Sequence, residues 1–338
     1  MSDLPFKMQQ WWVVPGAGGG LLECRTVDTP TIASNDVLVE VHAAGINRGE
    51  LIGRAAMRSD APGQKPRRSG IEFSGRVVGV GDGVDSWSVG DRVMGRGGAC
   101  HAQFVTAGAS ACMPSPGHLS EAQAGSIPNV FVTAHDAMVS AAGVKAGESV
   151  LITAGSSGVG TAAIQTARYL GAAQIVATTR SPHKAAELRS LGATHVVDTG
   201  RSLWLDEIAS IGDGMDVVID QVGGELFPQL IRTLRVKGRY VTVGRNAGAQ
   251  STIDLDLVAR NRLLLAGVTF RTRTPGEALA CSQKFAADLL GAFDPDANGD
   301  VQLWPVLDRT FSMSELPEAH DYMLSNQQIG KIVLLPHR

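Results

Sequence analysis

The fold is decided by the segment Val150-Leu-Ile-Thr-Ala-Gly155-Ser-Ser-Gly158-Val-Gly160-Thr-Ala-Ala-Ile-Gln-Thr-Ala-Arg-Tyr-Leu-Gly171. Residues 150–153 are apolar or β-branched and predict a buried strand, whereas the apolar spacing over 159–170 predicts a helix. A glycine-rich turn joins the two. A turn of this kind between a buried strand and a helix is the context that a dinucleotide-binding motif requires. The segment therefore predicts a dinucleotide site.

Each glycine of this turn has a physical reason. Gly155 allows the tight turn, Gly158 lets the backbone approach a pyrophosphate, and Gly160 lets the helix pack closely on the strand. The helix N-terminus adds free N–H donors and partial positive charge. Ser157 occupies the position of the usual middle glycine, so the strict G-x-G-x-x-G pattern is not met. The alternative is an ordinary strand-to-helix turn, which the flanking elements make the weaker interpretation.

The composition is that of a soluble globular protein. The chain has 338 residues, 44% of them hydrophobic and 19% charged, and a net charge of −3, which leaves no basic excess for nucleic-acid binding. Four cysteines are scattered without a C-x-x-C pair, which argues against a disulfide framework. The sequence shows no signal-peptide pattern, and no apolar run reaches the about 18–20 residues of a membrane span. We therefore expect a cytoplasmic protein of about two domains that does not bind membranes.

Two patterns alternate along the chain. Residues 8–116 read as short strands and glycine-rich turns. From residue 150 strands alternate with helices, which predicts a doubly wound parallel sheet of the Rossmann type. The expected strands are 150–153, 174–178, 195–197, 215–220, 239–243 and 263–267, and the expected helices are 158–170, 182–191, 203–211 and 225–234. After these we expect a helix over 275–291, a strand over 307–311, a helix over 315–325 and a strand over 331–335.

These patterns predict an α/β fold in which a β-rich domain is interrupted by a Rossmann domain. The expected boundaries are 1–128 for the first part of the β-rich domain, 129–268 for the Rossmann domain and 269–338 for the part that completes the β-rich domain.

The residues after the second expected Rossmann strand favour NADP(H) over NAD(H). An NAD site places Asp or Glu near this point to accept a hydrogen bond from the ribose 2′-hydroxyl, but no acid occurs between Gly171 and Ala186. Arg180, Ser181 and Lys184 instead offer donors that match a 2′-phosphate. The alternative is that these three are ordinary solvated residues at a helix start.

Several motifs occur in the order typical of one family. They are Ala43-Ala-Gly45-Ile-Asn47-Arg48, Gly70-Ile-Glu-Phe-Ser-Gly75-Arg-Val-Val-Gly79-Val-Gly81, Val89-Gly-Asp-Arg-Val93, the turn 157–160, Asp220-Gln-Val-Gly-Gly224 and Ile329-Gly-Lys-Ile-Val-Leu334. Over essentially its whole length the chain resembles the medium-chain dehydrogenases/reductases, specifically their zinc-free quinone oxidoreductase branch. Within this branch it is most similar to the p53-inducible quinone oxidoreductase group, through Asn47-Arg48, Arg271-Thr-Arg273, Glu318-Ala-His320, Asn326 and Gly330-Lys331. The resemblance implies that the β-rich domain is GroES-like and catalytic.

The resemblance also implies a site without metal. Zinc-dependent members of this superfamily carry a Cys where Asn47 stands and a His where Ile71 stands, and neither residue present here is a plausible zinc ligand. A site without a Lewis acid suits acceptors that take hydride unaided, namely quinones and alkenes conjugated to a carbonyl.

The implied site residues extend over the whole chain. Asn47 is placed beside the nicotinamide ribose and the substrate, which makes it the candidate catalytic residue. The turn of Gly155, Ser157, Gly158, Val159 and Gly160 is assigned to the pyrophosphate, and Arg180, Ser181 and Lys184 to the 2′-phosphate. The other implied cofactor contacts are Thr133, Val222, Gly223, Gly244, Phe270, Arg271, Asn326 and Lys331.

The resulting hypothesis is an NADPH-dependent reductase of a small quinone or enone, with the proton supplied by water. An enoyl-thioester or haloacrylate-type reductase and a catalytically idle NADPH-binding protein are the alternatives. A homodimer is implied by the family, which pairs through Rossmann edge strands, here residues 263–267. The physiological acceptor, any protein proton donor and the oligomeric state stay open.

A second motif resembles a calcium loop. Residues 294–300 read Asp-Pro-Asp-Ala-Asn-Gly-Asp, but the position that should supply a bidentate Glu is Pro305. We therefore interpret this segment as a solvated turn, and whether it binds anything stays open.

Overall fold

The computed structural model describes residues 4–296 and 302–337. The chain forms two compact units. The first unit takes its residues from 1–129 and 305–338, and the second unit from 130–304. The first is rich in antiparallel strands and the second holds a parallel sheet of the Rossmann type, so the predicted α/β fold class is confirmed.

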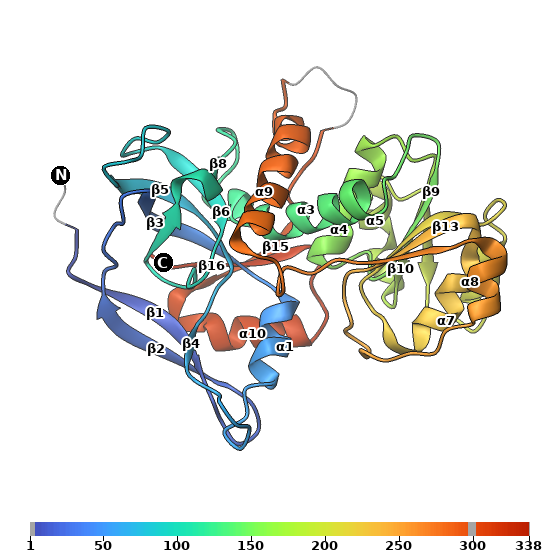
Figure 1. Cartoon of the computed structure of the whole chain (residues 1–338), viewed down its shortest axis with the longest axis horizontal. Coiled ribbons are helices and arrows are strands. Elements are labelled where there is room, and N and C mark those ends of the chain that lie inside the picture. The colour runs from blue at the N-terminus through green and yellow to red at the C-terminus, as the bar shows by residue number, and fades with distance from the viewer. Residues whose placement is uncertain (1–3, 297–301, 338) are drawn as a thin grey trace. The chain divides into compact units, whose positions relative to one another are not determined.

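The first unit is built on two sheets (Figure 1). The larger has the order β15-β16-β3-β5-β6-β8, with β7 also paired to β3, and the smaller has the order β2-β1-β4. The strands are β1 (Lys7–Val14), β2 (Leu21–Asp28), β3 (Asp36–Ile46), β4 (Arg67–Arg68), β5 (Glu72–Val80), β6 (Arg92–Arg96), β7 (Phe104–Gly108), β8 (Cys112–Pro114), β15 (Leu307–Ser312) and β16 (Lys331–Leu335). Three of its helices are α1 (Arg48–Ala55), α2 (Glu121–Ala124) and α10 (Leu316–Leu324).

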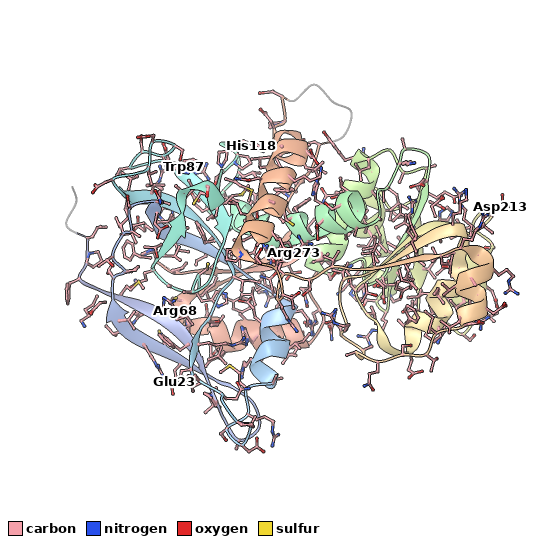
Figure 2. The ribbon with its side chains drawn as sticks, viewed as in Figure 1. Glu23, Arg68, Trp87, His118, Asp213 and Arg273 are labelled. Atoms are coloured by element: carbon pink, nitrogen blue, oxygen red, sulfur yellow. The ribbon has the colours of Figure 1, made fainter. Side chains whose placement is uncertain are left out.

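In the smaller sheet, Arg68 of β4 and Glu23 of β2 lie opposite Trp12 on its two sides; both charged residues are labelled in Figure 2. This register places Arg67 and Arg68 in a short exposed strand.

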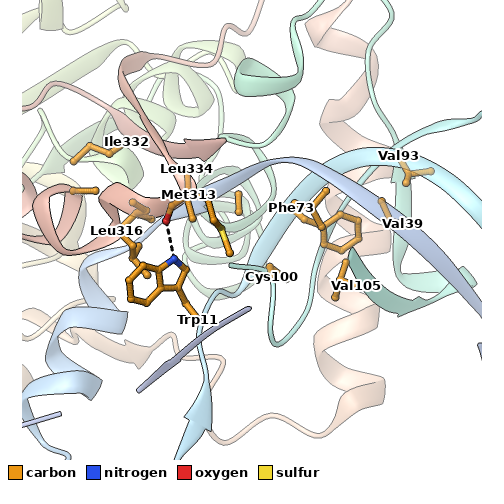
Figure 3. Packing of buried hydrophobic residues seen from close by; sticks show 14 of the residues in the cluster. Trp11, Val39, Phe73, Val93, Cys100, Val105, Met313, Leu316, Ile332 and Leu334 are labelled. Carbon is orange, nitrogen blue, oxygen red and sulfur yellow. Dashed lines mark hydrogen bonds between the residues drawn. The ribbon is translucent and has the colours of Figure 1, made fainter. Parts of the chain in front are cut away.

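The carboxy-terminal segment completes the larger sheet of the first unit. Strand β16 pairs antiparallel with β3 and parallel with β15. The core beneath it joins Trp11, Phe73, Leu316 and Ile332, which come from both ends of the chain (Figure 3). The Trp11 indole N–H donates a 2.7 Å hydrogen bond to the Met313 carbonyl, so even the polar atom of this core residue is paired.

The second unit contains one parallel sheet with the order β11-β10-β9-β12-β13-β14. Its strands are β9 (Ser149–Ile152), β10 (Gln174–Thr179), β11 (His195–Asp198), β12 (Met215–Asp220), β13 (Leu234–Thr242) and β14 (Leu264–Gly267). Helices α3 (Pro128–His135), α4 (Gly158–Tyr169), α5 (Ala185–Ser190), α6 (Trp204–Ala209), α7 (Phe227–Leu230), α8 (Leu255–Asn261) and α9 (Pro275–Leu289) complete the helical elements, with α3 beginning at the unit boundary. The strand order reverses at β9, and ligands of such sheets bind at the carboxyl ends of the strands near this point.

Two differences from the sequence analysis stand out. The helix expected over 225–234 is reduced to α7 between two short 3₁₀ turns, and β13 begins at Leu234 instead of 239. Among the described residues, 269–296 and 302–304 belong to the second compact unit, whereas the expected boundary lay at 268. The reason is aromatic packing, because Phe293 meets Phe131 edge-on at 4.9 Å and Phe285 lies 6.5 Å from the same ring.

Candidate functional site

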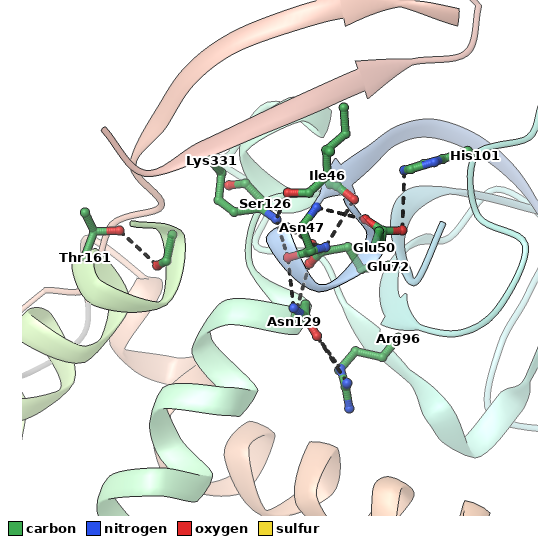
Figure 4. A network of polar contacts seen from close by, with 12 residues as sticks. Ile46, Asn47, Glu50, Glu72, Arg96, His101, Ser126, Asn129, Thr161 and Lys331 are labelled. Carbon is green, nitrogen blue, oxygen red and sulfur yellow. Dashed lines mark hydrogen bonds and ion pairs between the residues drawn. The ribbon is translucent and has the colours of Figure 1, made fainter. Parts of the chain in front are cut away.

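A buried polar cluster lies at the end of β3 and the starts of β5 and β16 (Figure 4). The Lys331 ammonium lies 2.7 Å from Glu72 Oε1 and 2.8 Å from Asn47 Oδ1. Asn47 Nδ2 donates to the same Glu72 oxygen over 2.7 Å. Asn129 closes the cluster by donating from its side chain to Asn47 Oδ1 (2.9 Å) and from its backbone to Glu72 Oε2 (2.7 Å). We call Asn47, Glu72, Asn129 and Lys331 the Asn47 cluster.

Strand order explains why these residues meet. Strand β3 lies between β16 and β5, and Ile46 at its end faces Ile332 of β16. Asn47 follows β3 directly, Glu72 begins β5 and Lys331 begins β16. The sheet register therefore brings together residues that are 259 positions apart.

The hydrogen-bonding groups of the cluster are engaged by one another and by neighbouring residues, including Arg96, which donates to Asn129 Oδ1 at 3.1 Å. Lys331 donates its third bond to the Ile46 carbonyl at 2.8 Å, and an ammonium has three donors. Asn47 uses both its amide nitrogen, which also contacts the Gly45 carbonyl at 3.3 Å, and its oxygen. The exposed fractions of Asn47, Glu72 and Lys331 are 7%, 0% and 3%. The two predicted site residues Asn47 and Lys331 are thus brought together, but in an ion-pair network rather than on an open surface.

Next to the cluster, Glu50 and His101 form a second buried pair. Glu50 Oε2 accepts the Asn47 backbone N–H at 2.8 Å, and its Oε1 lies 3.9 Å from His101 Nε2. Neither Oε1 nor Nε2 has a hydrogen-bond partner within the described residues. Burial raises the pKa of Glu50 to about 7 and lowers the pKa of His101 to about 3, because both side chains lose their hydration. At neutral pH the His101 ring is therefore uncharged.

In the second unit, Ser157 caps helix α4. Its hydroxyl oxygen accepts the Gly160 N–H at 3.0 Å, and the hydroxyl donates to Gln221 Oε1 at 2.8 Å. A side chain at Gly160 would collide with the Ala154 carbonyl, and one at Gly155 would lie 2.9 Å from the Ala177 methyl group. The N–H groups of the first helical turn, including Gly158 and Val159, have no acceptor inside a helix and suit an anion. The turn therefore fits a dinucleotide pyrophosphate.

Asp220, at the end of β12, holds the loop that follows it. Its completely buried carboxylate accepts bonds from the Thr153 hydroxyl (2.8 Å), the Tyr240 hydroxyl (2.7 Å) and the backbone N–H groups of Val222 and Gly223 (both 2.9 Å). The Asp220 carbonyl also accepts the Gly244 N–H at 3.1 Å. The predicted residues Val222, Gly223 and Gly244 are thus fixed by one acidic side chain and its backbone.

The three residues assigned to a 2′-phosphate differ in exposure. Arg180 is exposed and Ser181 is half-buried, with its N–H donated to the Thr179 hydroxyl at 3.1 Å. Lys184 is only 2% exposed. The alternative interpretation, that all three are solvated residues at a helix start, therefore does not hold for Lys184. Arg180, in contrast, is exposed to solvent.

The remaining predicted residues lie in different surroundings. Thr133 is buried in α3, and Arg271 is exposed. The Arg273 guanidinium stacks on Phe270 at 4.9 Å. Asn326 adopts a left-handed backbone (φ 57°) and accepts a 2.6 Å bond from Arg48, the neighbour of Asn47.

Sequence reasoning missed Glu72, Asn129 and Gln221 as site residues. Glu72 carries a detectable signal, because an acid between the apolar residues Ile71 and Phe73 at the start of an expected strand requires a partner once it is buried. Asn129 and Gln221 carry none, since their roles depend on contacts made by the folded sheets.

Among residues 4–296 and 302–337, no group of three His, Cys, Asp or Glu side chains is placed to hold a metal ion. Residues 297–300 of the calcium-loop-like segment lie outside the described residues. In the described part of the chain, no helix has the length and apolar character needed to cross a membrane.

Comparison with known proteins relates both units to dehydrogenases. Residues 33–146 match the alcohol dehydrogenase GroES-like domain, and residues 158–284 match the zinc-binding dehydrogenase family. The spectinabilin polyketide synthase system protein NorB of Streptomyces orinoci is 33% identical over 96% of this chain, which spans only 14% of that protein. A quinone oxidoreductase-like protein 2 homolog of Nematostella vectensis is 26% identical over 90% of this chain and 83% of its own. The chain spans at most a fifth of the length of the polyketide synthases that it matches.

Solved structures extend the likeness to whole chains. An alcohol dehydrogenase superfamily protein from Novosphingobium aromaticivorans is 32% identical, with a TM-score of 0.83 over 97% of this chain and 99% of its own. The CurK enoyl reductase is 26% identical, with a TM-score of 0.82 over 97% and 99%. A mycobacterial protein complexed with NADPH is 26% identical, with a TM-score of 0.84 over 97% and 100%. On these grounds the chain belongs to the medium-chain dehydrogenase/reductase family and is of the quinone oxidoreductase type.

Proposed function

We propose that this protein is an NADPH-dependent oxidoreductase that reduces a small quinone or an α,β-unsaturated carbonyl compound without a bound zinc ion. The observation that carries the proposal is the capped N-terminus of α4, where the Ser157 turn fits a pyrophosphate. The NADPH complex of a structural relative supports the choice of a nicotinamide cofactor.

The exposed Arg180 supports the phosphorylated cofactor. A guanidinium binds a phosphate through two parallel hydrogen bonds, whereas an NAD site would present a carboxylate to the ribose. Thr133, Phe270, Arg271 and Asn326 are proposed as further cofactor contacts. Because Lys331 has all three donors engaged, we propose that it acts through Asn47 instead of binding the cofactor directly.

Bound NADPH would supply the hydride, and the acceptor would take it at a quinone carbonyl or at the β-carbon of an enone. The reduced acceptor then needs one proton, which we assign to water. The role proposed for Asn47 is to orient the acceptor or the cofactor ribose, since an amide is not an acid at neutral pH. Hydrogen bonds to Glu72 and Lys331 hold the Asn47 side chain in one orientation, and Asn47 would keep this orientation beside a ligand.

An enoyl-thioester reductase is the second candidate function. It is favoured by the polyketide synthase relatives, whose matching segments cover nearly the whole of this chain, and by the likeness to the CurK enoyl reductase. In this reaction hydride would add to the β-carbon of the thioester and a proton to its α-carbon. The chemistry demanded of the cofactor site is the same in both functions.

A substrate panel separates the candidates. Oxidation of NADPH is followed by absorbance with 9,10-phenanthrenequinone, with simple enones and with enoyl thioesters of CoA. Consumption of NADPH with quinones or enones, and not with thioesters, is the expected result. A preference for thioesters would select the second function, and tight binding of NADPH without oxidation by any acceptor would leave an idle cofactor-binding protein.

The proposed role of Asn47 is tested with Asn47→Ala. Because Asn47 belongs to the buried cluster, the substitution could unfold the protein, so the melting temperature of the variant is measured first. In the folded variant, the change in kcat is then compared with the change in the Kd for NADPH. Turnover should fall more than NADPH affinity. Normal turnover in a folded Asn47→Ala protein would remove Asn47 from the acceptor side.

A further inference from the structure

Gln221 makes four hydrogen bonds, three of which link the pyrophosphate turn to the end of β9. Its side-chain Oε1 accepts the Ser157 hydroxyl at 2.8 Å, and its Nε2 donates to the Thr153 carbonyl at 2.8 Å. Its backbone N–H donates to the Thr153 hydroxyl at 2.8 Å, and its carbonyl accepts Asn246 Nδ2 at 2.9 Å. The residue is 5% exposed. One amide side chain therefore bridges the end of β9 and the cap of α4.

The direction of these bonds fixes the Ser157 hydroxyl. Because Gln221 Oε1 can only accept, the hydroxyl proton points toward Gln221, and the hydroxyl oxygen is left to accept the Gly160 N–H. The cap of α4 is held in one orientation in this way. The adjoining Asp220 fixes Val222 and Gly223 of the next loop.

We infer that Gln221 is a positioning residue for the nicotinamide cofactor, and that its side chain must be uncharged and must both donate and accept a hydrogen bond. The inference rests on the proposed function, since it assumes that the cofactor phosphates bind at the N-terminus of α4. An amide both donates to Thr153 and accepts from Ser157 without adding charge beside the helix terminus.

A carboxylate at position 221 would fail for two physical reasons. It would have no proton to donate to the Thr153 carbonyl, and it would place a negative charge at the helix end that is proposed to attract the pyrophosphate. When protonated, however, a carboxyl group donates one bond and accepts another, as the amide does. The defect of a Gln221→Glu variant should therefore disappear as the pH falls through the titration of that carboxyl group.

Gln165 provides a matched control in the same unit. It is 4% exposed, its Nε2 donates to the Trp304 carbonyl at 2.9 Å, and its Oε1 accepts the Trp304 N–H at 2.8 Å. Gln165→Glu thus replaces another buried amide that both donates and accepts. Its Nε2 also contacts the Thr161 carbonyl at 3.2 Å, so its bonds go to Thr161 and Trp304 and not to residues 155–160.

The experiment measures the Kd for NADP⁺ by calorimetry between about pH 5 and pH 8, a range that spans the titration of a carboxyl group with a raised pKa. For Gln221→Glu we expect the Kd at pH 8 to rise about tenfold or more, because a hydrogen bond is lost and a negative charge is added beside the phosphates, and to approach the wild-type value at pH 5. Gln165→Glu should stay within about twofold of wild type at both pH values, because additive effects are expected for bonds that do not share partners.

The possible outcomes separate the inference from the proposed function. Wild-type affinity of Gln221→Glu at pH 8, an equal loss in Gln165→Glu, or a loss that does not depend on pH would each overturn the role of Gln221 while the proposed function stands. Failure of the wild-type protein to bind NADP⁺ would overturn both.

If Gln221→Glu does not fold, Ser157→Ala and Gln221→Met are compared singly and together. A shared hydrogen bond predicts that the second substitution adds little to the loss of NADP⁺ affinity caused by the first. Independent, additive losses would contradict the inference.

Discussion

The Lys331 ammonium and the Glu72 carboxylate form a 2.7 Å ion pair in which both side chains are almost completely buried. Burying two charges is costly, and such a pair persists only when its remaining donors and acceptors are also satisfied. Here Asn47, Asn129 and the Ile46 carbonyl satisfy them. The pair therefore links β16, the last strand of the chain, to β5 in the larger sheet of the first unit.

Removing one member of this pair should destabilise the protein strongly. Lys331→Met leaves Glu72 charged and unpaired, which we expect to lower the free energy of unfolding by about 3–5 kcal/mol in urea titrations. The double variant Lys331→Met/Glu72→Gln removes both charges and should recover part of the loss. A loss of less than about 1 kcal/mol in the single variant, as is usual for surface pairs, would show that the pair is not buried in solution.

Glu50 should give the protein an unusual pH dependence of stability. Its pKa is raised from 4.5 to about 7, so the folded protein keeps a proton that the unfolded chain releases between these values. The stability contributed by protonated Glu50 is therefore present below about pH 4.5 and is lost as the pH rises through about 7. The free energy of unfolding of Glu50→Gln minus that of wild type should therefore increase by about 1 kcal/mol for each pH unit between about 4.5 and 7.

Comparison with the variant is needed because two histidines act in the opposite direction. Burial lowers the pKa of His101 to about 3 and that of His320 to about 4, so their contribution is lost as the pH falls below about 6.5. These contributions cancel when wild type and Glu50→Gln are measured at the same pH. A constant difference between the two proteins from pH 5 to pH 8 would mean that Glu50 titrates like an exposed carboxylate, near pH 4.

Arg180 should determine the preference for the phosphorylated cofactor. Arg180→Ala removes a charge-assisted contact with the 2′-phosphate, so the Kd for NADPH should rise about tenfold while the Kd for NADH hardly changes. Arg189→Ala, in which an exposed arginine of α5 is removed, is the control for a general change of charge. Equal effects of the two substitutions would contradict the assignment of Arg180.

The edge of the parallel sheet should form a dimer contact. Strand β14 ends the strand order, and Leu264 and Leu265 on it are 64% and 44% exposed, which is the kind of edge that pairs with another strand. We expect a homodimer by sedimentation velocity, and a shift toward monomer in Leu264→Lys. A wild-type protein that is monomeric at micromolar concentration would refute this contact.

Local sequence signals predicted the second unit well. Helix α4 was expected over 158–170 and is found at Gly158–Tyr169, and all six strands of the parallel sheet were anticipated. Glycine turns and apolar strands are properties of adjacent residues, so they can be read without knowing the tertiary structure.

Long-range contacts could not be predicted in this way. Glu72 and Lys331 meet through the order of β16, β3 and β5, which no local pattern specifies. The burial of Lys184 and the packing of α9 on Phe131 depend on surfaces from distant segments. The expected helix over 225–234 is interrupted because tertiary context outweighs a weak local preference.

The central claim is reduction by NADPH without a metal, and one kinetic measurement tests it most directly. The protein is dialysed against a strong chelator, its zinc content is determined, and it is then mixed with NADPH and the panel of acceptors. We predict that NADPH is oxidised at the same rate as before dialysis. Oxidation that stops after dialysis and returns only when zinc is added would contradict the account, as would the absence of NADPH oxidation with every acceptor.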